Sequence, residues 1–170
     1  MKADLDRMLA RLVGKSMWIA RRAADMATFQ FGERRQRQTH DGRTAEVGEF
    51  ALHVQCAWRI LRGDKVVVGS RDLYSPANHD DSQPNPETFD WDRDPNRRDA
   101  LLHDLFDGGT RAYVVTAAQT GRAGTCGIDF DQGMRLELFP DDSSADEHWR
   151  LFEVGGAHVV VSVNEISTDS

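Results

Sequence analysis

The segment 51–60, ALHVQCAWRI, carries a histidine, a cysteine, a glutamine and an arginine, which are residue types found in nucleophilic and acid–base sites. A thiol nucleophile needs a base within hydrogen-bonding distance. Apolar and polar residues alternate strictly over residues 50–60, however, as in a strand with one face in the core. Because successive side chains leave opposite faces of a strand, Cys56 is predicted to point into the apolar layer and His53 away from it. The alternation argues against a Cys56–His53 dyad within this segment.

The polar residues of this strand form a row on the face opposite the core. His53, Gln55 and Arg59 share that face, and about 20 Å of extended chain separates His53 from Arg59. A row of this length does not converge on one point, so an ordinary half-exposed strand face is the favoured interpretation. The alternative is a pocket on the polar sheet face around these three residues, in a small-molecule-binding protein or a small enzyme.

Two groups of side chains have the residue types of metal ligands. Asp99, His103 and Asp107 recur every four residues along a predicted helix, but they lie opposite its leucines, which favours a solvated helix face. The run His79–Asp81 falls in a predicted loop, where ordering the chain opposes metal binding. We therefore predict no metal site from either group.

Paired carboxylates for acid–base work are the remaining possibility. Asp129 and Glu137 lie on predicted neighbouring strands, on a polar face where water is expected to keep their pKa values ordinary. The glycine pair Gly108–Gly109 follows a helix and precedes a strand, which is the reverse of a phosphate-binding loop. We predict no catalytic residue and no cofactor.

An acid–aromatic segment, Phe89-Asp90-Trp91-Asp92, lies within residues 75–97, where no periodicity is visible. Long connections of this kind are functional or poorly ordered, and we expect this acidic loop to be flexible. Aromatic side chains among charges are typical of binding anchors, so these four residues are candidates for binding a partner. The favoured alternative is that the two aromatic rings pin the loop to the core.

Composition limits the classes of protein. The chain has 170 residues and a net charge of −7, which suits one domain over 1–170 and disfavours a nucleic-acid partner. No apolar stretch reaches the length of a membrane span, so we expect no membrane and a cytoplasmic location. Cys56 and Cys126 both fall on apolar strand faces and are predicted to be reduced core residues.

Two helices and about eight strands are expected to position these residues. Residues 4–13 form an amphipathic helix that ends at Gly14 and packs on the sheet or on a second copy in a homodimer. A second helix is predicted to be capped by Asp94. The remaining pattern predicts an α+β domain in which mostly antiparallel strands form a bent sheet or partly open barrel, with the second helix between two strand groups.

Two phrases, ALHVQCAWR and LELFPDDSSADEHWRLF, resemble sequences of small uncharacterised bacterial proteins. That resemblance implies an α+β domain without an assigned activity and supplies no catalytic residue. The sequence therefore predicts a non-enzymatic binding or interaction protein with an unknown protein partner or small ligand. A regulatory or toxin-neutralising role, as in immunity proteins of similar size and charge, is one concrete version.

Overall fold

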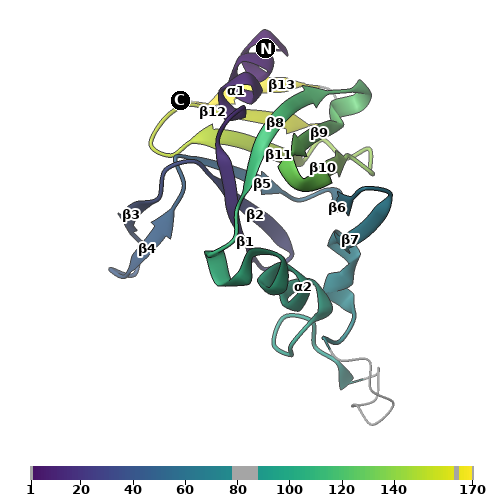
Figure 1. The fold of residues 1–170 in the computed structure, drawn as a ribbon. Helices are drawn as coiled ribbons and strands as arrows, with labels where there is room; N and C mark the ends of the chain where they lie inside the picture. Colours follow the sequence, from purple (N-terminus) through teal and green to yellow (C-terminus); the bar gives the residue numbers. More distant parts are fainter. Residues whose placement is uncertain (1, 78–87, 163–164, 170) are drawn as a thin grey trace.

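The computed structural model describes residues 2–77, 88–162 and 165–169 (Figure 1). Its helices are α1 (Lys2–Leu12) and α2 (Arg97–Phe106), with short 3₁₀ helices η1 (Ser70–Tyr74), η3 (Asp107–Gly109), η4 (Arg122–Gly124) and η5 (Asp131–Gly133). Its strands are β1 (Ser16–Ala23), β2 (Met26–Phe31), β3 (Arg35–Gln38), β4 (Thr44–Val47), β5 (Phe50–Val54), β6 (Ala57–Arg62), β7 (Lys65–Gly69), β8 (Tyr113–Thr120), β9 (Cys126–Phe130), β10 (Met134–Phe139), β11 (Glu147–Glu153), β12 (His158–Ser162) and β13 (Ile166–Asp169).

Eleven of these strands form one antiparallel sheet in the order β13-β12-β11-β5-β2-β1-β8-β9-β10-β6-β7, and β3 pairs only with β4. The predicted α+β class, the N-terminal helix and the second helix are confirmed. The predicted count of about eight strands is wrong, and the sheet is not closed into a barrel. One reason is that residues 50–60, whose alternation predicts one strand, contribute to both β5 and β6. Another is that residues 166–169 pair with β12 as β13.

The join between β5 and β6 bends the sheet. These strands are separated by two residues in the chain, yet β2, β1, β8, β9 and β10 lie between them in the sheet. At the join, the backbone N–H groups of Gln55 and Cys56 both donate to the carbonyl oxygen of His148, at 2.8 and 3.1 Å. Such a bulge lets one extended segment pass from one half of a bent sheet to the other. We call residues 54–57 the β5–β6 corner.

The core lies between the two halves of the bent sheet. The ring of Phe29 on β2 meets the ring of Trp58 on β6 edge to face, with centroids 5.2 Å apart. The predicted facing of the 50–60 segment is confirmed, since all six apolar residues at its even positions are buried: Phe50, Leu52, Val54, Cys56, Trp58 and Ile60. Cys56 and Cys126 are free and buried, as predicted.

Helix α1 covers one part of the sheet (Figure 1). Its buried residues are Leu5, Met8, Leu9 and Leu12, and they pack against the sheet of the same chain. Val13 was expected in the same stripe but is 48% exposed, because the helix ends at Leu12. Gly14 follows with φ of 84°, which fits the predicted glycine stop.

Helix α2 begins later than the sequence predicts. Asn96, not Asp94, is its cap, and the Asn96 side chain accepts the N–H of Asp99 at 2.9 Å. Asp94 instead accepts the N–H of Asp90, which closes a turn before the helix. No helix in the described part of the chain is long and apolar enough to cross a lipid bilayer.

Candidate functional site

A polar cleft of about 340 Å³ opens beside the β5–β6 corner. Its walls come from the corner, from η1, from the first turn of α2, from the β1–β2 turn and from the segment after β10. Ligand pockets in proteins range upward from roughly 300 Å³, so this cleft suits a small molecule. We call it the Arg98 cleft after its most buried charged residue; the lining residues used below are Asp25, Gln55, Cys56, Trp58, Tyr74, Arg98, Asp141 and Asp142.

Arg98 is a buried cation that has no carboxylate partner among the described residues. Only 1% of the residue is exposed. Its Nη1 donates to the carbonyl oxygen of Asp25 at 2.9 Å, while Nε and Nη2 have no acceptor in the described part of the chain. The Nε and Nη2 donors lie side by side on one edge of a guanidinium, and that edge matches the two oxygens of a carboxylate. The arrangement leaves a bidentate anion-binding edge unused.

The charge of Arg98 is energetically costly in these surroundings. Burial lowers the pKa of its guanidinium. The ordinary pKa of arginine is so far above neutrality that the group still carries its charge. A buried charge without a counter-charge is destabilising, because it has lost water and gained too little in return. Partial compensation comes from the charges of Asp99 and Asp25, which oppose the lowering of the pKa, and from the ring of Trp58, whose centroid lies 5.9 Å from Cζ of Arg98.

Helix periodicity places Arg98 in the interior. Arg98, Leu102 and Phe106 recur every four residues and are the buried residues of α2. Arg98 is not among the residues predicted from the sequence, since an arginine in the first turn of a helix is usually solvated. The signal that was present is its spacing from two large apolar residues, which puts it on the core-facing stripe.

The corner supplies the opposite wall of the cleft. Gln55 is exposed at its mouth, and the Ser70 hydroxyl accepts the N–H of Trp58 at 3.2 Å. Cys56 also borders the cleft, and burial together with the negative charge of Asp141 raises the pKa of its thiol to about 12. A thiol with this pKa stays protonated at neutral pH and is a poor nucleophile.

The predicted polar row does not gather at the cleft. Of its three residues only Gln55 lines the cleft. His53 lies before the corner, where its ring meets the ring of Phe152 at 4.9 Å. Arg59 lies beyond it, where its Nε donates to Glu137 at 2.8 Å. The corner separates these residues, because β5 and β6 pair with different strands.

The described part of the acid–aromatic segment is held by contacts within the chain. Trp91 meets the ring of Tyr74 edge to face, with centroids 5.8 Å apart. Asp92 accepts Nη1 of Arg22 at 2.8 Å, and the carboxylate of Asp90 accepts the N–H of Asp92 at 3.1 Å. Phe89 is half-buried. The segment therefore forms an outer support of the Arg98 cleft through Tyr74, which lines it.

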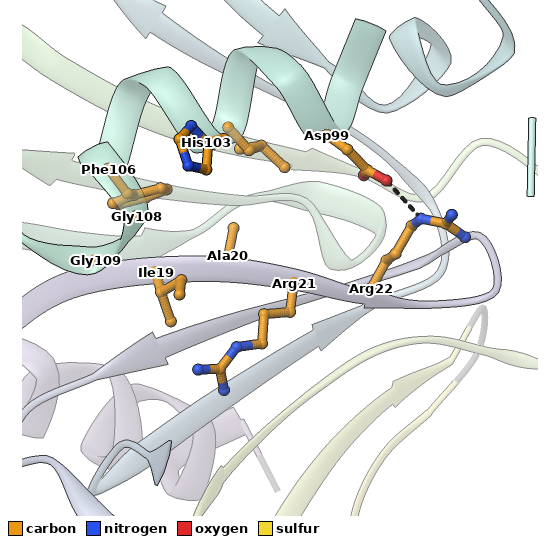
Figure 2. A pocket seen from close by; sticks show the side chains of 10 residues that line it. Ile19, Ala20, Arg21, Arg22, Asp99, His103, Phe106, Gly108 and Gly109 are labelled. Carbon is orange, nitrogen blue, oxygen red and sulfur yellow. Dashed lines mark hydrogen bonds and ion pairs between the residues drawn. The ribbon is translucent and has the colours of Figure 1, made fainter. Parts of the chain in front are cut away.

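A second hollow, of about 220 Å³, lies between α2 and β1 (Figure 2). Its floor is apolar, with Ile19 from the strand and Phe106 from the helix. At its rim Arg22 reaches across to Asp99, with Nε at 2.7 Å from the carboxylate (Figure 2). Nη1 and Nη2 of Arg22 donate to the side chain and the carbonyl of Asp92. We call it the α2–β1 hollow. Every guanidinium nitrogen of Arg22, at its rim, has a hydrogen-bond partner.

Asp99, His103 and Asp107, which were considered as metal ligands, have different surroundings from one another. Asp99 is engaged by Arg22 and Asn96, whereas the His103 side chain is 71% exposed. Asp107 ends α2 in a left-handed conformation. Within the described ranges no three histidine, cysteine, aspartate or glutamate residues are grouped so that they could hold a metal ion. The run 79–81 lies outside the described residues.

Asp129 and Glu137 are joined by an arginine. Arg135 makes an ion pair with each of them. Burial would raise the pKa of Glu137, but hydrogen bonds from Arg59 and Arg135 outweigh it and lower that pKa. The expectation of an ordinary pKa is therefore wrong for Glu137. A carboxylate held in its ionised form in this way suits a structural ion pair better than a general acid.

The fold is an antiparallel sheet with a small polar cleft beside the β5–β6 corner. Comparison with protein-family models, with curated proteins and with solved structures found no match to this chain. The function is therefore argued from the cleft itself.

Proposed function

We propose that this is a non-enzymatic binding protein that holds the carboxylate group of a small organic ligand in the Arg98 cleft. One observation carries the proposal: among the described residues the Nε and Nη2 donors of a buried guanidinium have no acceptor, and Arg98 lines the cleft. Both nitrogens are solvent-inaccessible, so the guanidinium would turn toward the cleft, where a ligand carboxylate would accept from both donors and supply the missing counter-charge.

The charges around the cleft select a carboxylate over a phosphate. Asp25, Asp141 and Asp142 line the same cavity as Arg98. The three aspartates are exposed, and like charges repel, so a dianionic phosphate is disfavoured beside them more than a monoanionic carboxylate. A single carboxylate needs only the one guanidinium edge. The protonated thiol of Cys56 supports binding without covalent chemistry.

The test compares an acid with its neutral amide. In NMR spectra of the arginine Nε–H groups, hexanoate is expected to shift the Arg98 signal, whereas hexanamide at the same concentration leaves it in place. The variant Arg98→Met is expected to lose hexanoate binding. The matched control is Arg97→Met, because Arg97 is the preceding residue of α2, is exposed and does not line the cleft. Equal responses to acid and amide, or unchanged binding by Arg98→Met, would overturn the proposal.

A second variant guards against misfolding. Arg98→Lys retains a positive charge but not the paired donors of the guanidinium edge. It is expected to fold and to bind hexanoate more weakly than the wild type. Full affinity in this variant would mean that the charge alone matters and that the guanidinium edge does not.

The surface around Phe89–Asp92 stays a predicted partner site. A regulatory or toxin-neutralising role likewise stays a prediction. Asp90 and Asp92 make hydrogen bonds within the chain. For this reason the cleft, and not the acid–aromatic segment, carries the proposal.

A further inference from the structure

We infer that the ligand of the Arg98 cleft is a small zwitterion, whose carboxylate binds Arg98 and whose cationic group lies against Asp141 and Asp142. This inference rests on the proposed function and names its ligand class. It starts from the presence of both charge signs in one cavity: Arg98 on one wall, and the two aspartates after β10 on another.

Both aspartates are held in place through one oxygen. Oδ1 of Asp141 accepts the N–H of Ala57 at 3.2 Å. Oδ1 of Asp142 accepts the N–H and the hydroxyl of Ser144, at 2.8 and 2.7 Å. These bonds from Ser144 lower the pKa of Asp142, which keeps it ionised at neutral pH. In the described part of the chain the second oxygen of each carboxylate has no hydrogen-bond partner.

The positive and negative groups face the same short stretch of chain without pairing. Asp141 is bonded to Ala57, and the guanidinium of Arg98 lies over the ring of Trp58, the next residue. Arg98 nevertheless forms no ion pair with either aspartate among the described residues. Opposite charges in one cavity that do not satisfy each other are each available to a ligand that carries both signs.

An aromatic side chain adds to this preference for a cation. Tyr74 lines the cleft and is 51% exposed, which is unusual for a large ring. The face of an exposed tyrosine attracts an ammonium or guanidinium group. The cleft thus offers a cationic ligand group two carboxylates and a ring.

The experiment uses four six-carbon probes that differ only in their charged groups: 6-aminohexanoate, 2-aminohexanoate, hexanoate and hexylamine. Dissociation constants are measured by NMR titration of the full chain. At least one aminohexanoate is expected to bind about two- to fivefold more tightly than hexanoate, the range typical of partly exposed ion pairs. Which isomer binds more tightly reports the spacing between the two charge sites.

Variants assign this gain to the aspartates. The double variant Asp141→Asn, Asp142→Asn is expected to bind the aminohexanoates no more tightly than hexanoate. The matched control is Asp146→Asn, since Asp146 is exposed in the same segment but does not line the cleft. It is expected to keep the gain.

The possible failures are distinguishable. If hexanoate binds as tightly as both aminohexanoates, or if the double variant keeps the gain, the zwitterion inference is wrong while carboxylate binding stands. If none of the carboxylates shifts the Nε–H signal of Arg98, the proposed function is wrong and the inference falls with it.

Discussion

Two arginines near the start of α2 have opposite surroundings. Arg22, at the rim of the α2–β1 hollow, uses all three of its nitrogens within the chain, on Asp99, Asp92 and the carbonyl of Ala24. Arg98, in the first turn of α2, uses only Nη1 among the described residues. An arginine with partners for every nitrogen joins segments of the fold. Arg98 is more deeply buried and has two donors without an acceptor among the described residues, which is why we propose that it binds a ligand.

A third basic group, His53, is also partly buried, and burial together with the positive charge of Arg150 lowers its pKa. An imidazole can avoid a poorly compensated charge by losing its proton. The guanidinium of Arg98 stays protonated at any physiological pH. His53 can therefore neutralise itself, whereas Arg98 stays charged and is proposed to gain a counter-charge from a ligand.

The largest effect is expected for Arg98→Met. Removing one partner of a buried charge pair costs about 2–5 kcal/mol, so hexanoate affinity should fall by roughly 30-fold or more. Because a buried unpaired charge is replaced by an apolar side chain, the melting temperature without ligand should stay the same or rise. Calorimetry with and without hexanoate checks both. A marked loss of stability without ligand would mean that Arg98 has a structural role like that of Arg22.

The next largest effect is expected for Arg22→Met. This change leaves Asp92 and Asp99 without their shared cation, and we expect the free energy of unfolding to fall by about 2 kcal/mol. For a domain of this size that is a drop of about 4–8 °C in melting temperature. Arg21→Met is the control, because among the described residues Arg21 makes no ion pair, donates to the carbonyl of Glu46 and lies over the ring of Trp18. Similar stability of the two variants would remove the contrast between Arg22 and Arg98.

A smaller effect is expected at the start of α2, which carries both Arg98 and Asp99, the partner of Arg22. Asn96→Ala removes the cap, and we expect a loss of about 1 kcal/mol in urea unfolding. The Asn96 side chain also donates to Asp99, the partner of Arg22. Asp94→Ala should cost less, because Asp94 is exposed and does not cap the helix. The reverse order would restore Asp94 as the cap predicted from sequence.

The smallest effect is expected from the pH dependence of His53. Its folded-state pKa lies below the ordinary value of 6.5, so the unfolded chain binds the proton more readily. The stabilisation from neutral His53 is complete above pH 6.5 and is lost as the pH falls through the folded pKa. In urea unfolding from about pH 7.5 to about pH 5, His53→Gln should lose less stability than the wild type.

The control for this titration is His40→Gln, since His40 is exposed at the β3–β4 turn. This variant should follow the wild-type profile. If the stability of His53→Gln also follows the wild-type pH profile, the charged form of His53 is not poorly compensated in the fold, and its likeness to Arg98 is wrong.

The local pattern predicted several features correctly. Alternation placed Cys56 and Trp58 in the core, and helical spacing placed Leu5 and Leu9 of α1 on the sheet. The pattern could not show that β5 and β6 are separate strands, since the alternation continues through the corner. It identified Gln55 as a candidate but grouped it with His53 and Arg59, which pair with strands in different halves of the sheet.

The sequence by itself determined which way side chains face along each segment, because facing follows from the short repeats of strand and helix. Only the tertiary structure decided where segments cross. The carbonyl of His148 accepts from Gln55 and Cys56, more than ninety positions earlier in the chain, and this contact creates the corner that forms the cleft. The state of Arg98 was likewise decided by Trp58 and Asp25, since burial and missing partners depend on what other segments bring to a residue.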